Sequence, residues 1–182
     1  MADVNVSTAS SRLPGPESDR SGSSGPTFDL IELLFFAYRD FIGDADEVLA
    51  EIGFGRAHHR VLHFVNRHPG MRVADLLDVL KITKQSLGRV LRELVDDGYV
   101  VQKAGPADRR QRLLYLTSKG EALARDLATL QTRRLARALI ECGPGARVTI
   151  RRFLVAMIDT EAREEVERLI ARADRAVRNR TR

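Results

Sequence analysis

The feature that most constrains the fold of this chain is an amphipathic helix followed directly by two short strands, within residues 83–117. Apolar residues follow the i, i+3, i+4, i+7, i+8 spacing of a half-buried helix, at Leu87, Val90, Leu91, Leu94 and Val95. Thr83 is suited to cap the start of this helix, and Gly98 is suited to end it. Residues 99–101 and 113–116 are rich in β-forming side chains and enclose a polar stretch with Gly and Pro. They predict a β-hairpin with a long charged loop.

Two shorter helices are predicted just upstream of this unit. The first runs from about Arg56 to Arg67, where His68-Pro69-Gly70 stops it, and the second covers Val73 to Leu80. Three short helices followed by a two-stranded wing form a winged helix-turn-helix, in which the third helix enters the major groove of DNA.

Apolar residues also mark helices on both sides of this lobe. Residues 28–42 suit a helix that is buried on a wide face and ends at Gly43. Downstream, Ser118 and Glu121 match a capping box that opens a helix, and a last continuous helix is predicted over 147–178. The apolar faces of these flanking helices exceed what a lobe of about 60 residues covers, so we expect them to be buried between two copies of the chain.

The predicted fold class is therefore mainly α: a winged helix-turn-helix lobe with a two-stranded β-hairpin wing, flanked by N- and C-terminal dimerisation helices. Residues 1–26, half of them Ser, Gly or Pro, are predicted to form a disordered arm. Residues 27–55 are expected to form the N-terminal dimerisation helix and a linker, and 56–117 a DNA-binding lobe. Residues 118–182 are expected to form the C-terminal dimerisation helices and a basic tail.

The composition argues against several other classes of protein. No run of 18 apolar residues exists, so neither a transmembrane span nor a membrane partner is expected, and no secretory signal is visible at the start. Cys142 is the single cysteine, which excludes an internal disulfide and suits a reducing, cytoplasmic location. No Gly-rich phosphate loop, nucleophile elbow or paired-carboxylate motif is present, so we expect neither an enzyme nor a cofactor.

Charge is distributed unevenly along the chain. Segment 27–55 has a net charge of −6, whereas 56–117 and 118–182 each have +6. The bases are 26 Arg against four Lys, and arginine makes forked contacts with phosphates and guanine edges. An excess of positive charge within a folded region favours double-stranded DNA as a partner.

The helix that follows Thr83 holds the first group of candidate DNA-binding residues. Gln85, Arg89 and Arg92 project from its polar side, where Gln85 can pair with adenine edges and Arg89 with guanine or phosphate. Thr83, Lys84 and Ser86 lie at the helix start, where free backbone N–H groups and the helix dipole favour a phosphate.

The hairpin holds the second group. Its sequence DRRQRLLYLT, residues 108–117, resembles the aspartate-x-arginine, then leucine-threonine, signature of the MarR family of multiple antibiotic resistance regulators. ITKQSL at 82–87 and DGYV at 97–100 also look like that family's recognition helix and its entry to the wing, and the resemblance covers residues 56–122 closely. It implies a homodimer whose two winged lobes grip a palindromic operator, more often as a repressor that a small ligand releases.

The resemblance also implies roles for single residues. Arg110 would be the wing-tip arginine that enters the minor groove, and Asp108 its orienting partner, while Arg109 and Arg112 would contact phosphates or the hairpin. A narrow minor groove concentrates negative potential and attracts arginine. In the family the junction between lobe and dimer helices holds inducers, often aromatic anions. The corresponding ligand-binding candidates here are Phe35, Phe36, Tyr38, Arg39, His58 and His59.

Two alternative functions stay open. His58, His59 and His63 lie on one predicted helix and suggest a metal-sensing regulator, but a zinc site needs a further carboxylate or thiol ligand, so no metal residue is assigned. The other alternative is a DNA-architectural protein with little sequence preference, whereas a dimer on a palindrome discriminates clearly between DNA sequences.

Overall fold

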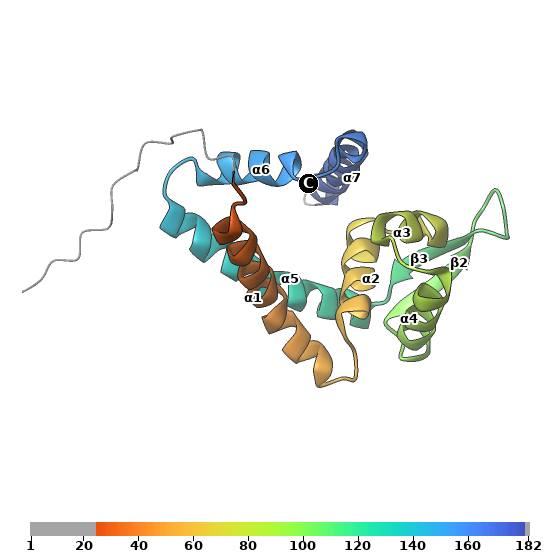
Figure 1. The fold of residues 1–182 in the computed structure, drawn as a ribbon. Helices are drawn as coiled ribbons and strands as arrows, with labels where there is room; N and C mark the ends of the chain where they lie inside the picture. Colours follow the sequence, from red (N-terminus) through yellow and green to blue (C-terminus); the bar gives the residue numbers. More distant parts are fainter. Residues whose placement is uncertain (1–24, 181–182) are drawn as a thin grey trace, which may run out of the picture.

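The computed structural model describes residues 25–180, which form seven helices and one small sheet (Figure 1). The elements are α1 (Phe28–Ala50), α2 (Arg56–Arg67), β1 (Met71–Arg72), α3 (Val73–Leu80), α4 (Lys84–Asp96), β2 (Val100–Ala104), β3 (Arg112–Leu116), α5 (Ser118–Cys142), α6 (Ala146–Ala156) and α7 (Thr160–Arg180). All but the last two residues of the predicted arm 1–26, and the last two residues of the basic tail, lie outside the described residues. In the part that is described, no helix has both the length and the apolar content to cross a membrane.

Three helices and the sheet form a lobe around an apolar core, to which Ala45 and Leu49 of α1 and Ala124 and Leu127 of α5 also contribute. The sheet is antiparallel with strand order β1-β3-β2, and the hairpin pairs Val100 with Leu116 and Ala104 with Arg112. The α2, α3 and α4 helices each contribute fully buried side chains to one cluster with the sheet: Val61, Leu62, Val65, Leu76, Leu87, Leu94, Val100 and Leu114. The predicted winged helix-turn-helix and its hairpin wing are thereby confirmed.

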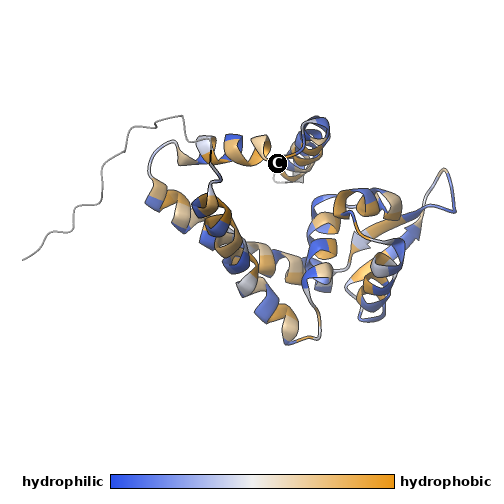
Figure 2. Ribbon diagram, viewed as in Figure 1, coloured by the Kyte–Doolittle hydropathy of each residue, from blue (hydrophilic) through white to orange (hydrophobic). Residues whose placement is uncertain are grey.

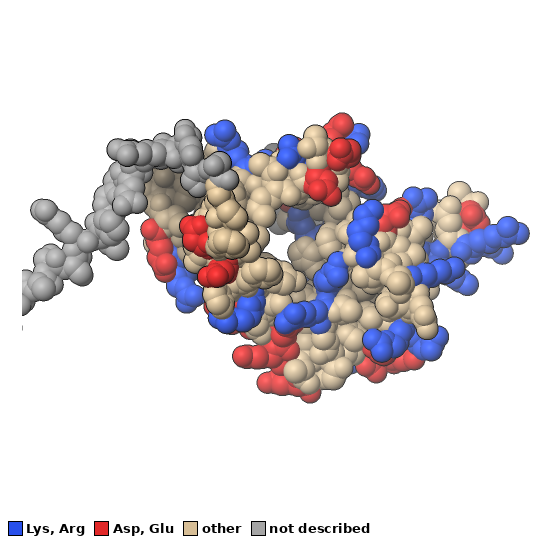
Figure 3. Space-filling model, viewed as in Figure 1, with Lys and Arg blue, Asp and Glu red and all other residues tan. Residues whose placement is uncertain are grey.

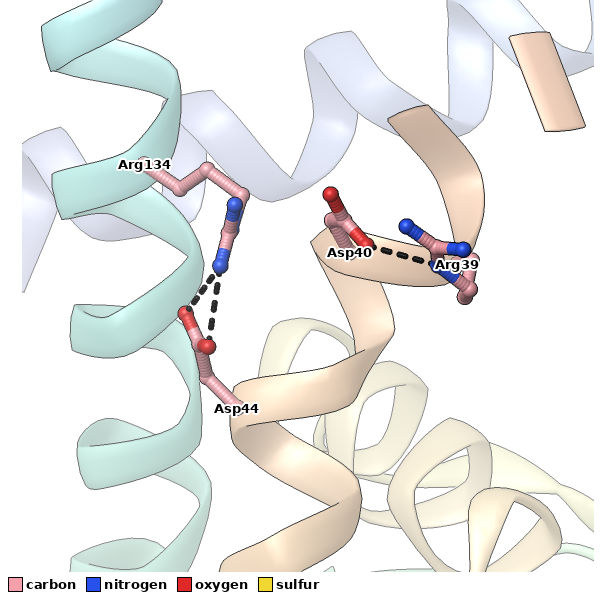
Figure 4. Close-up of polar contacts among 4 residues, drawn as sticks. All are labelled: Arg39, Asp40, Asp44 and Arg134. Carbon is pink, nitrogen blue, oxygen red and sulfur yellow. Dashed lines mark hydrogen bonds and ion pairs between the residues drawn. The ribbon is translucent and has the colours of Figure 1, made fainter. Parts of the chain in front are cut away.

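The long helices α1 and α5 lie against each other beside this lobe (Figure 1). Asp44 on α1 and Arg134 on α5 join them, because Nη2 of Arg134 donates to both carboxylate oxygens of Asp44 at 2.9 and 3.0 Å (Figure 4). Only the C-terminal half of α1 is well covered, with Ile42, Ala45 and Leu49 buried. Its N-terminal half and α6 carry exposed apolar residues, which appear orange in Figure 2.

The flanking helices differ from the prediction in two places. The first helix does not end at Gly43 but continues to Ala50, because burying Ala45 and Leu49 outweighs the cost of one helical glycine, about 1 kcal/mol. The predicted last helix is two helices, broken at residues 157–159. Arg163 holds the break, since its guanidinium donates to the carbonyls of Ala156 at 2.6 Å and Ile158 at 2.8 Å.

Two smaller expectations also need correction. The sheet has a third strand, because Met71 and Arg72 pair with Leu114 and Leu113 of β3. The N-cap of α5 is Thr117 rather than Ser118: the Thr117 hydroxyl accepts from the Gly120 amide at 3.1 Å and donates to the Gly98 carbonyl at 2.7 Å. The second of these bonds ties the cap to the end of α4 and so selects Thr117 over its neighbour.

Candidate nucleic-acid interface

Thr83, the N-cap predicted from the sequence, defines the start of α4. Oγ1 of Thr83 accepts a hydrogen bond from the Ser86 amide at 3.2 Å and donates to Oγ of Ser86 at 3.0 Å. Thr83 is thus the N-cap, as predicted. It leaves the Lys84 and Gln85 side chains exposed in the first turn, where the helix dipole favours an anion.

Along α4 the apolar and polar faces separate as expected. Leu87, Val90, Leu91 and Leu94 are buried in the lobe core. Gln85, Arg89 and Arg92 are exposed, and within the described residues none of the three has a hydrogen bond or ion pair to another side chain. Side chains without such partners are available to bind a ligand from solvent.

The tip of the wing is an ordered turn built around Asp108. Its carboxylate accepts from the Arg110 amide at 2.9 Å, and its carbonyl accepts from the Gln111 amide at 3.1 Å. The turn closes where the Gly105 amide donates to the Gln111 carbonyl at 3.0 Å. Asp108 therefore contacts the backbone of Arg110 and leaves the guanidinium unpaired.

The wing presents its bases to solvent. Arg109, Arg110 and Arg112 are exposed, and in the described part of the chain no acid pairs with them. Lys and Arg side chains gather at the wing end of the molecule in Figure 3. Lys103 was not among the candidates from sequence; it is a further exposed base of the hairpin, with its Nζ 5.0 Å from the centre of the Tyr115 ring. In the sequence Lys103 could have been found as a base close to a short predicted strand, next to the arginine-rich loop.

The predicted ligand residues lie in two separate environments. Phe35, Phe36, Tyr38 and Arg39 are exposed on α1, and Arg39 pairs with its neighbour Asp40 at 2.8 Å, which lowers the pKa of that carboxyl (Figure 4). His58 and His59 are buried on α2. A cavity of about 140 Å³ beside Arg134 is lined by Asp44, Leu130, Arg133, Arg134 and Arg137, and it contains none of the ligand candidates.

The three histidines of α2 have different surroundings. His58 accepts from the Gly55 amide at Nδ1, 3.1 Å away, and its Nε2 lies 2.6 Å from Oε2 of Glu93. Desolvation by burial lowers the pKa of His59. Desolvation, with the nearby basic side chains, also lowers the pKa of His63 to about 4, although part of the His63 residue is exposed. Among residues 25–180 no cluster of three or more His, Cys, Asp or Glu side chains is arranged to hold a metal ion.

Comparison with known proteins agrees with this geometry. The model of the MarR family matches residues 52–111. The chain is 48% identical over 139 residues to the HTH-type transcriptional regulator PetP of Rhodobacter capsulatus, covering 76% of this chain and 84% of PetP. Two solved structures share the fold at TM-scores of 0.54 and 0.51. The first is a cysteine-to-serine mutant of E. coli MarR complexed with operator DNA, at 23% identity over 72% of this chain and 97% of that one. The second is the Mycobacterium tuberculosis MarR family protein Rv2887 in complex with p-aminosalicylic acid, at 24% identity over 71% and 96%.

The fold is that of a winged-helix DNA-binding transcription regulator. The match to PetP and the match to the family model show which family of such regulators this is: the chain belongs to the MarR family. The resemblance that residues 108–117 suggested is thereby confirmed.

Proposed function

We propose that this protein binds a palindromic DNA operator as a homodimer and represses transcription until a small ligand releases it. The observation that carries the proposal is the set of unpaired bases on two neighbouring elements of one lobe, Arg89 and Arg92 on α4 and Arg109, Arg110 and Arg112 on the wing. In the proposal α4 reads the major groove while the wing lies along the adjacent minor groove. Lys84 and Ser86 contact phosphate at the helix start.

The exposed apolar surface outside the lobe supports the homodimer. The N-terminal half of α1 exposes a dense group of large apolar side chains: Phe28, Leu30, Ile31, Leu33, Leu34, Phe35, Phe36 and Tyr38. Further exposed apolar residues lie on α6, including Val148, Phe153 and Leu154. Contiguous surfaces of this kind mark interaction sites, and a second copy supplies the matching surface under twofold symmetry. Residues 27–55 and 118–182 then serve as the dimerisation region around the lobe at 56–117.

Release by a ligand follows from the position of the lobes on the DNA. Two half-sites about 34 Å apart must face both copies of α4 at once, so a ligand that favours another lobe separation lowers the affinity for the operator. Phe35, Phe36, Tyr38, Arg39, His58 and His59 remain the proposed ligand residues. An aromatic anion is the proposed ligand class, and the p-aminosalicylic acid bound by Rv2887 belongs to it.

The test of this function is selection of bound fragments from genomic DNA, followed by mapping of the protected bases. We expect a protected palindrome with two half-sites one helical turn apart. Binding of all fragments with similar affinity would instead support a DNA-architectural protein. Failure to retain any duplex at low salt would contradict both functions.

Substitutions in α4 should change which sequences are bound. Replacing Gln85 or Arg89 with alanine is expected to weaken operator binding by about 1–3 kcal/mol per lobe and to relax the preference at particular base pairs. Affinities measured on a series of operators, each with one base pair changed, check this. Equal losses on every operator of the series would show that these side chains contact only the backbone.

Substitution in the wing should have a different effect. Arg110→Ala is expected to weaken binding and to reduce the slope of log affinity against log salt by about 0.9 per lobe, because one fewer counterion is displaced. Its effect on sequence preference should be confined to A·T-rich flanks, since the minor groove distinguishes base pairs poorly. Titrations at several salt concentrations measure the slope, and an unchanged slope in a folded variant would remove Arg110 from the interface.

A further inference from the structure

An aromatic ring anchors the linker between α1 and α2 in the lobe. Phe54 lies between Gly53 and Gly55 and is 9% exposed. Its ring is stacked on the His58 ring, with centroids 4.4 Å apart and planes 5° apart, and it meets the Tyr99 ring edge-on at 5.2 Å. One side chain of the linker therefore contacts both α2 and the residue that precedes strand β2.

The His58 ring connects Phe54 to α4, because it stacks on the Phe54 ring and is hydrogen-bonded to Glu93. Because the Gly55 amide donates to Nδ1, the ring hydrogen is carried by Nε2, which donates to Glu93 at 2.6 Å. The His58 side chain is 11% exposed and Glu93 is 44% exposed. A hydrogen bond to a carboxylate is directional and stronger than a neutral one, so it fixes the last turns of α4 against the start of α2.

The same end of α4 is also held where the chain leaves the lobe. Nζ of Lys119, in the first turn of α5, donates to the Asp97 carbonyl at 2.9 Å and lies 4.1 Å from the centre of the Tyr99 ring. The Thr117 hydroxyl donates to the Gly98 carbonyl. The C-terminal end of α4 is thus attached both to the linker from α1 and to the start of α5, while its first turn is free to contact a ligand.

We infer that His58 and Glu93 are positioning residues for DNA recognition. Their hydrogen bond, with the Phe54 ring behind it, sets the angle at which α4 is held relative to α1 and α5. In a dimer joined through α1 and the C-terminal helices, that angle sets the distance between the two copies of α4. The inference rests on the proposed function, since it concerns how the two lobes fit the two half-sites.

The test is a comparison of operators whose half-sites are moved by one or two base pairs. The wild type should lose affinity steeply with each change of spacing. Glu93→Ala should bind the natural spacing about fivefold more weakly per lobe, and its affinity should vary much less with spacing. Glu93→Gln should behave like the wild type, because an amide oxygen still accepts from Nε2 of His58.

Asp96→Ala is the matched control. It removes the same charge from the same helix, but Asp96 is exposed and makes no side-chain hydrogen bond or ion pair within the described residues. It should therefore keep the spacing profile of the wild type. A Glu93→Ala profile as steep as that of Asp96→Ala, or a Glu93→Gln profile as flat as that of Glu93→Ala, would overturn the positioning role.

A second measurement needs no DNA. Spin labels on Ala104→Cys in a Cys142→Ser background report the distance between the two wings of a dimer. Glu93→Ala should broaden this distance distribution, and Asp96→Ala should leave it unchanged. If the distribution broadens but no operator is found, the proposed function fails, while the role of the His58–Glu93 hydrogen bond in orienting the lobes holds. If an operator is bound and neither readout responds to Glu93→Ala, only the positioning role fails.

Discussion

Replacing Gly120 with alanine should destabilise the protein by about 3 kcal/mol or more. Gly120 is buried in the first turn of α5, and an added Cβ would lie 2.1 Å from the carbonyl oxygen of Tyr99. That oxygen also accepts from the Thr117 amide at 3.0 Å, so the backbone cannot retreat without breaking the junction between the wing and α5. Overpacking costs about 1–3 kcal/mol where side chains can yield, and more where they cannot. The free energy of unfolding in urea measures the effect.

Gly88→Ala is the control for this prediction. Gly88 is also helical, but in α4, and apart from its chain neighbours and the backbone of its own helix no atom lies within 4 Å of its added Cβ. The substitution should therefore stabilise the protein by about 0.5–1 kcal/mol, the usual gain on replacing a helical glycine with alanine. The two variants should change stability in opposite directions. A stabilised Gly120→Ala protein would show that the Tyr99 carbonyl and the first turn of α5 are not in contact there.

Replacing Leu34 with aspartate should abolish dimerisation and lower operator affinity by about 10²–10⁴-fold. Leu34 is 45% exposed in the single chain and lies in the apolar half of α1. A charge there would have to be buried at the proposed interface, which is strongly unfavourable. Monomers would then bind one half-site each and lose the gain in affinity from linked binding. Sedimentation at micromolar concentration and operator titration measure the two effects.

Ala50→Asp adds the same charge to the same helix and serves as the control. Ala50 is exposed at the end of α1, away from the apolar stretch, so this variant should remain dimeric and should bind the operator. Circular dichroism should show that both variants keep their helices. A dimeric Leu34→Asp protein with normal operator affinity would place the dimer interface elsewhere.

The lobe could be predicted well because its signals are local. The period of Leu87, Val90, Leu91 and Leu94 defines one buried face, and Thr83 caps the same helix. The hairpin was predictable for the same reason, since its strands flank a polar loop close in sequence. Strand β1 was missed because two residues are too few to show an alternating pattern.

Features that depend on distant residues could not be predicted in this way. His58 and Glu93 are 35 positions apart, and nothing in either sequence context indicates that they meet. The break before α7 depends on the Arg163 side chain, which binds carbonyls five and seven residues upstream. Of the site candidates, the wing bases were proposed from a motif. The ligand residues of α1 and α2 were grouped by family resemblance, and the single chain does not bring them into one cavity.

The break between α6 and α7 affects which part of the molecule unfolds first. It turns α7 back onto the lobe of its own chain, where Ala173 is buried, Leu169 packs on the core and Asp174 pairs with Arg67. Few contacts hold this helix, whereas α2 beneath it is embedded in the core. Amide hydrogens of α7 should therefore exchange with solvent well before those of α2, so that partial unfolding begins at the C-terminal helix and uncovers an otherwise intact lobe.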